Sequence, residues 1–249
     1  MADNTSTALP PRQGHLSPDD LVISAMEFFN VPCSQWTDDQ RLALTEYHET
    51  VPQIVRELNE DVDRCLSRVG LEPLVKLFDR IFFRGQLFDV RCMGATPEDL
   101  HDCYGCTETR EGQVYIYINS QHGQEDGDSS AAISVISTVL HECVHAYFTK
   151  AACKGSEDTD SCECKQAWRE DIGKGGHGES WQRLAAVVER KACEVLGMQV
   201  RLGREKAVQA HYDTTGDEFG REVIKFCFGE KAKLAVDDSS GTVEIVYSE

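Results

Sequence analysis

Residues 137–148 read STVLHECVHAYF, where His141 and His145 stand four positions apart and Glu142 follows the first histidine. Residues four apart on an α-helix differ by about 40° in direction and about 6 Å in height, so both imidazoles would project from one side and could chelate one cation. Glu142 would project just beside them, within reach of a water molecule on that cation. This HExxH pattern is typical of a helix that holds a catalytic metal.

A catalytic zinc is held by three protein ligands and keeps its fourth position for water, so a third ligand is required. His177 in GGHGESW is the best candidate, because glycines on both sides let the backbone bring an imidazole close and a predicted helix follows. The spacing from His145 is too long for the compact HExxHxxGxxH motif. We therefore predict Zn²⁺ as the cofactor, with His141, His145 and His177 as its ligands.

Glu142 is the predicted catalytic residue. Zinc makes its water molecule acidic, and Glu142 would take the water's proton and return it to the leaving amine, so no covalent acyl-enzyme should accumulate. The alternative for an isolated HExxH is a helix with two hydrogen-bonded or exposed histidines. We favour the metal because Ser134 and Thr138 extend a polar stripe along the same helix face as the two histidines, and because the third histidine is flanked by glycine.

The predicted secondary structure places these residues on helices. Apolar spacing predicts a helix from Ala131 to about Lys150 and another that begins after His177, whereas the polar, cysteine-rich residues 151–176 predict a long loop. GQVYIYINS alternates with a period of two and predicts a strand, with LFDVRCM and VEIVY as weaker strand candidates. Three helices are predicted upstream: one after an N-cap at Ser17, one from Thr37 to Gly70 that Pro52 breaks or kinks, and one from residue 71 to about Gly85.

The chain of 249 residues has 43 acidic and 25 basic side chains, a formal net charge of −18. This charge repels a phosphate backbone and argues against tight general binding to duplex DNA. The N-terminus lacks the pattern of a secretory signal, and no apolar run approaches the roughly 20 residues of a membrane span. We therefore expect an intracellular protein, nuclear or cytoplasmic, with no membrane partner.

In that compartment the 11 cysteines are expected to be reduced thiols or metal ligands. Cys103 and Cys106 could form half of a structural zinc site, with Cys162 and Cys164, or Cys153, as the other half. These spacings do not form a standard zinc finger, and unpaired loop thiols are the preferred interpretation. The remaining histidines have no partner pattern and are expected at the surface: His15, His48, His101, His122 and His211.

The ordered succession of these segments resembles the SprT-like metallopeptidases, the group that includes Spartan. LVKLFDRIFFRGQL is similar to that family's opening helix and its turn into the first strand, and VYIYINS to its edge strand. VLHECVHAYF is similar to its HExxH helix, and GHGESW to its third-ligand motif. The resemblance implies an α+β, zincin-like metallopeptidase domain, mainly helical with a small β-sheet. It also implies His141, His145 and His177 as zinc ligands and Glu142 as general base.

The resemblance further implies a protein substrate and, in Spartan-type members, proteolysis of proteins crosslinked to DNA, triggered by single-stranded DNA. No ubiquitin-binding zinc finger, sliding-clamp peptide or basic aromatic strip for stacking bases is evident. Single-stranded DNA stays open as a partner, although the net charge does not support it. The oligomeric state is not indicated.

The expected organisation is a disordered tail (1–16), an N-terminal helical segment (17–70), the SprT-like metallopeptidase domain (71–200) and a C-terminal extension (201–249). The alternative function is a non-enzymatic, zinc-stabilised protein-binding module with an acidic surface. In that case a fourth protein ligand, such as Cys153, Cys162 or Cys164, would close the metal site.

Overall fold

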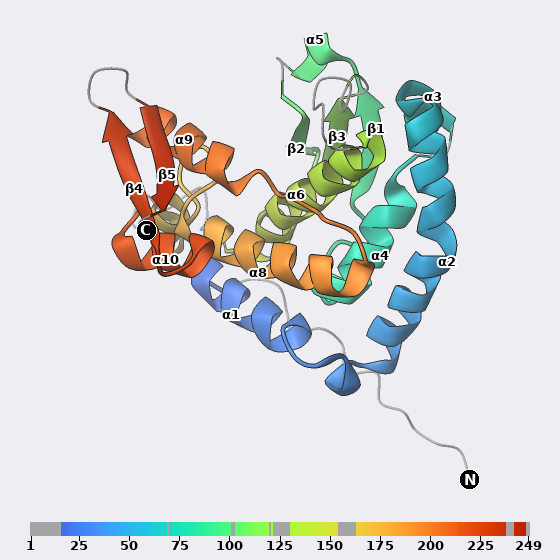
Figure 1. The fold of residues 1–249 in the computed structure, drawn as a ribbon, viewed down its shortest axis with the longest axis horizontal. Coiled ribbons are helices and arrows are strands. Elements are labelled where there is room, and N and C mark those ends of the chain that lie inside the picture. The colour runs from blue at the N-terminus through green and yellow to red at the C-terminus, as the bar shows by residue number, and fades with distance from the viewer. Residues whose placement is uncertain are drawn as a thin grey trace.

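The computed structural model describes residues 16–68, 70–100, 103–119, 121, 130–153, 163–237 and 242–247. These residues form an α+β fold that is mainly helical and contains two small sheets (Figure 1). The predicted class is confirmed at this level. The tail predicted to be disordered lies outside the described residues, apart from Leu16.

The N-terminal helices begin where side chains cap them. Ser17 and Thr37 each accept a hydrogen bond from the backbone N–H three residues on, and Asp20 and Gln40 bond back to the cap residues, so both helices start with a capping box. The bounds are α1 (Pro18–Phe29), the 3₁₀ helix η1 (Cys33–Gln35), α2 (Asp38–Glu60), α3 (Val62–Arg68) and α4 (Glu72–Phe82).

Pro52 was predicted to break or kink the second helix, and the prediction of a break is wrong. Helix α2 runs through Pro52, and the chain leaves the helical conformation at Asp61 instead. Val51 and Ile54, on either side of the proline, are buried in the core. Their burial holds the helix together at the one position where proline removes a backbone hydrogen bond.

The larger sheet has the order β1-β3-β2, so β2 is an edge strand. Strand β3 pairs with β1 in parallel and with β2 in antiparallel register. As predicted, Val114, Ile116 and Ile118 of β3 are buried, while Tyr115 and Tyr117 lie on the other face. The bounds are β1 (Arg91–Ala95), the short helix α5 (Pro97–Leu100), β2 (Gly105–Arg110) and β3 (Gln113–Asn119).

Helix α6 (Ala131–Ala151) runs through the centre of the molecule. It packs against β2 and β3 on one side and against α2, α4 and α8 on its other sides (Figure 1). Within the described chain it alone is long and apolar enough, by length and composition, to cross a membrane, and 67% of that window is buried inside the protein. The prediction that no apolar run approaches the length of a membrane span did not take account of this helix, whose apolar residues lie mostly in the core.

The C-terminal half begins with helices where the sequence indicated a loop. Residues 163–171 form α7, which packs against α1 and α8, so the prediction of a loop over 151–176 is wrong for this part; residues 154–162 lie outside the described chain. A second, two-stranded sheet packs on α9 and α10. The bounds are α7 (Glu163–Asp171), α8 (Glu179–Leu196), α9 (Arg204–Thr215), α10 (Arg221–Phe228), β4 (Ala232–Asp237) and β5 (Thr242–Tyr247).

Asp79 of α4 is a carboxyl group buried beneath the turn that leads into β1, with 2% of its surface exposed. Burial raises its pKa to about 7, although the backbone N–H groups of Leu87, Gln86 and Gly85 bond to it and oppose the shift. Its Oδ1 has no hydrogen-bond partner among the described residues. The ionised form of Asp79 is therefore costly in the folded protein.

Because the folded-state pKa of Asp79 lies above its unfolded value, its contribution to stability is complete below about pH 4 and is lost as the pH rises through about 7. The shift corresponds to at most about 4 kcal/mol. We expect Asp79→Asn to flatten the fall in the free energy of unfolding between about pH 5 and pH 8, measured by urea denaturation. The exposed Asp63→Asn is the control, and an unchanged slope for Asp79→Asn would contradict this account.

Candidate metal centre

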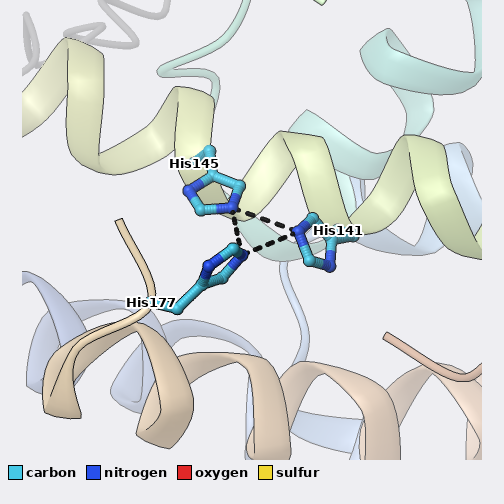
Figure 2. A group of neighbouring side chains, drawn as sticks. All are labelled: His141, His145 and His177. Carbon is cyan, nitrogen blue, oxygen red and sulfur yellow. Dashed lines mark hydrogen bonds between the residues drawn. The ribbon is translucent and has the colours of Figure 1, made fainter. Parts of the chain in front are cut away.

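Three histidine rings meet between α6 and the loop before α8 (Figure 2). His141 and His145 stand one turn apart on α6, and His177 reaches them from the loop. The Nε2 atom of His145 lies 3.1 Å from that of His141 and 3.1 Å from that of His177, and the third pair is 3.2 Å apart. The structure therefore brings together the histidines that the sequence singled out. Over the described part of the chain, this is the one group of His, Cys, Asp or Glu side chains that could hold a metal ion.

These distances are of hydrogen-bond length, yet three neutral imidazoles cannot all pair in this way. In a neutral ring each nitrogen either donates or accepts, and never both. In a triangle of three Nε2 atoms, at least one pair must therefore match donor with donor or acceptor with acceptor. A cation removes this conflict, because all three nitrogens can then present lone pairs to it.

The spacing also fits a metal. Three nitrogens that each lie about 2.0–2.1 Å from a tetrahedral zinc are about 3.3 Å apart. The observed distances of 3.1–3.2 Å are close to this value. The three histidines could thus bind one ion through Nε2, with little rearrangement of the side chains.

The rings are held in the neutral form that binds metals. Burial lowers the pKa of His141 to about 4, and burial together with the neighbouring histidines lowers the pKa of His177 to about 3. The pKa of His145 is also lowered well below its usual value by burial and by the other two rings. At neutral pH the centre therefore offers three uncharged imidazoles.

Glycines shape the loop that carries His177. Gly176 has a φ of +77°, and a Cβ atom there would lie 3.2 Å from the Cε1 atom of His145. At Gly178 a Cβ atom would lie 2.5 Å from the carbonyl oxygen of Asp171, which leaves no room for any side chain. The glycines around His177 thus allow the close approach that the sequence predicted.

Trp181 forms one wall of the centre and was not identified from the sequence. It is fully buried on α8, and its ring centroid lies 4.7 Å from that of His141, 5.3 Å from that of His145 and 4.7 Å from that of His177. Its position in the first turn of the helix that follows His177 is the sequence feature that could have indicated its role. The indole limits the rotation of all three imidazoles.

His141 has an outer hydrogen bond that fixes its tautomer. Its Nδ1 donates to the carbonyl oxygen of Leu202 at 2.8 Å, which leaves Nε2 free to bind a metal. The backbone N–H of Leu202 in turn donates to the carboxylate of Glu189 at 2.7 Å, and the N–H of Arg201 donates to Ser137 at 3.1 Å. The linker between α8 and α9 is thereby anchored where it supports the ligand.

Glu142 lies beside the histidines and is held by β2. Its Oε1 is 3.9 Å from the Nε2 of His141, and its Oε2 accepts a hydrogen bond of 2.7 Å from the hydroxyl of Thr107. Gly105 lets β2 lie close to Glu142 and Thr138. A Cβ atom at this position would lie 3.0 Å from Oε1 of Glu142 and 2.8 Å from Cγ2 of Thr138. Neither Gly105 nor Thr107 was identified from the sequence.

Glu142 is 4% exposed. Burial raises its pKa to about 7, and the hydrogen bond from Thr107 opposes that shift. A cation between the histidines would favour the charged form and lower the pKa. The arrangement therefore provides a carboxylate that can exchange a proton beside a metal ion.

Comparisons with protein-family models, with curated proteins and with solved structures find no match to this chain. The case for a functional site therefore depends on the geometry of these side chains. The similarity to SprT-like metallopeptidases stays a prediction drawn from the sequence motifs.

The other metal-binding candidates do not form a site within the described residues. Cys103 is exposed, Cys106 and Cys153 are half-buried, and all three are free thiols outside the histidine group. Cys162 and the side chain of Cys164 lie outside the described residues.

The remaining histidines divide into three cases. His48 is exposed, as predicted. His211 is buried, so the prediction that it lies at the surface is wrong; its ring packs against Phe219 and the loop before α8. His15, His101 and His122 lie outside the described residues.

We expect the chain to bind one divalent ion, and His177→Ala to weaken its affinity for zinc by at least about 100-fold, since even the loss of an outer partner costs about 10–100-fold. The measurement is competition with a chromophoric chelator, together with the metal content of the purified protein. His48→Ala is the matched control because this ring is exposed on α2. Equal affinities for the wild type and His177→Ala would place the metal elsewhere.

Proposed function

We propose that this chain is a zinc-dependent metalloendopeptidase of the SprT-like type, with a zincin-like catalytic domain. The observation that carries the proposal is the position of Glu142, whose buried carboxyl group lies next to a group of three converging histidines. Zinc enzymes that hydrolyse peptide bonds have this arrangement, in which three protein ligands hold the metal and a carboxylate lies beside it.

Zinc is the metal that this ligand set favours. Three neutral imidazoles and no carboxylate ligand do not suit magnesium or calcium, which prefer oxygen ligands. Zinc bound here would lower the pKa of a water molecule to about 7 and polarise the carbonyl group of a substrate.

Glu142 performs the proton transfers in the proposed reaction. Its carboxylate takes a proton from the attacking water and returns it to the leaving amine. Thr107 holds Oε2 of this carboxylate at 2.7 Å, which leaves Oε1 on the side of the histidines. The reaction needs no nucleophilic side chain and forms no covalent link between substrate and protein.

The position of the edge strand β2 favours a polypeptide as the substrate. It passes directly beside Glu142 through Gly105 and Thr107, and its outer edge is not paired with another described strand. An extended peptide could add to such an edge through backbone hydrogen bonds, which depend little on the substrate's sequence. This would bring a scissile carbonyl group past the metal centre.

Proteins associated with or crosslinked to DNA are the substrate class that the sequence resemblance implies, and a nuclear or cytoplasmic location goes with it. The net charge of −18 argues against a broad electrostatic contribution to DNA binding. Cleavage of DNA-binding proteins with and without single-stranded DNA would therefore show whether DNA stimulates this chain.

The alternative of a closed structural zinc site needs a fourth protein ligand. Cys153 does not join the histidine group. The structure gives this alternative no support among the residues that it describes.

We expect Glu142→Gln to abolish cleavage of a denatured protein substrate while zinc stays bound, because glutamine keeps the shape of glutamate but cannot accept a proton. General base catalysis contributes about 10²–10⁴-fold, so the rate should fall by at least this much. Zinc content is measured on the same preparation. Retained cleavage by Glu142→Gln would exclude the mechanism, and loss of zinc would make the variant uninformative about proton transfer, which is why both are measured.

Thr107→Val should lower kcat by about 10-fold or more with little change in zinc affinity, because the isosteric valine removes the hydrogen bond that holds Oε2 of Glu142. Thr107→Ser keeps the hydroxyl and should retain most of the activity. Steady-state cleavage kinetics compare the two variants. Equal loss in both variants would contradict a specific role for the hydroxyl, because Thr107→Ser keeps this group.

A further inference from the structure

His211 on α9 is a buried polar side chain with an unsatisfied atom. Its exposed fraction is 7%, and its ring packs on Phe219 with the two ring centroids 4.6 Å apart. Its Nδ1 is shielded from solvent and has no hydrogen-bond partner among the described residues. Buried polar atoms in native proteins nearly always have a partner, so this atom calls for an explanation.

His177 also has an unsatisfied ring nitrogen, Nδ1, on the side of its ring that faces away from the metal centre. Its Nε2 points at the other two histidines, so its hydrogen belongs on Nδ1 when a metal is bound. That Nδ1 is also buried and has no partner in the described residues. A metal-binding histidine almost always donates this hydrogen to an acceptor, as His141 does to Leu202.

The ring of His211 packs against the loop that carries His177. Gly173 of this loop has a φ of +71°, and a Cβ atom there would be 3.2 Å from the Nδ1 of His211 and 3.9 Å from the Cα of Gly178, the residue after His177. A positive charge on His211 would also lower the pKa of His177, which places the two rings within electrostatic reach of each other. The absence of a side chain at Gly173 lets the ring of His211 approach the loop.

We propose that His211 is a positioning residue for the third ligand: its Nδ1 accepts the hydrogen on Nδ1 of His177 through one buried water molecule. His211 then carries its own hydrogen on Nε2. This contact satisfies both buried nitrogens at once and fixes the ring of His177 with its Nε2 toward the metal. The inference rests on the metal centre of the proposed function, but it does not depend on peptidase activity.

The test uses two substitutions of nearly equal shape. His211→Asn places an amide oxygen close to the position of Nδ1 and keeps the acceptor, whereas His211→Leu has a similar outline without any polar atom. Both remove the ring that packs on Phe219, so they share the loss of packing. The dissociation constant for zinc is measured by competition with a chelator, and thermal unfolding of the metal-free proteins reports on folding.

We expect His211→Leu to weaken zinc binding by about 10–100-fold and His211→Asn to stay within a few-fold of the wild type. Equal affinities for the two variants, or an unchanged affinity in His211→Leu, would overturn the role of His211 while leaving the metal centre intact. If the wild-type chain takes up no zinc, the proposed function and this inference both fall.

Discussion

Three imidazole nitrogens aimed at one point are the constraint on which the structure around the site depends. They cannot all satisfy one another by hydrogen bonds, so surrounding groups must hold the arrangement in place wherever a cation does not. Helix α6 fixes two rings by its pitch, and Trp181 packs against all three. The glycine-rich loop before α8 positions the third ring, that of His177. Preorganisation of this kind lowers the entropic cost of binding an ion.

The parts that local sequence encodes were predictable. The spacing of apolar residues indicated α6 and α8, the alternation in β3 indicated its two faces, and the HExxH spacing placed two histidines on one side of a helix. His177 could be found because glycine on both sides is a strong backbone signal. Each of these inferences needed only neighbours within about two helical turns or one strand.

The parts that depend on distant contacts were not predictable. Strand β2 has the polar sequence GCTETR and no clear alternation; it is a strand because it pairs with β3 and lies against α6. Thr107 holds Glu142 across 35 positions, and the carbonyl of Leu202 supports His141 across 61. A backbone carbonyl has no sequence signature at all. The residues next to His211 in the sequence likewise do not indicate that it is buried, and only tertiary packing shows this.

The burial of Glu142 connects the scaffold to the chemistry. A carboxylate in an apolar core is unfavourable without a partner of opposite charge, and the three histidines beside it are themselves held neutral by burial. The hydrogen bond from Thr107 offsets only part of this cost. A cation among the rings would resolve the conflict between the imidazole nitrogens and also compensate the charge on Glu142. The same burial that makes an isolated charge on Glu142 unfavourable therefore favours a cation beside it, because charges attract more strongly where water is excluded.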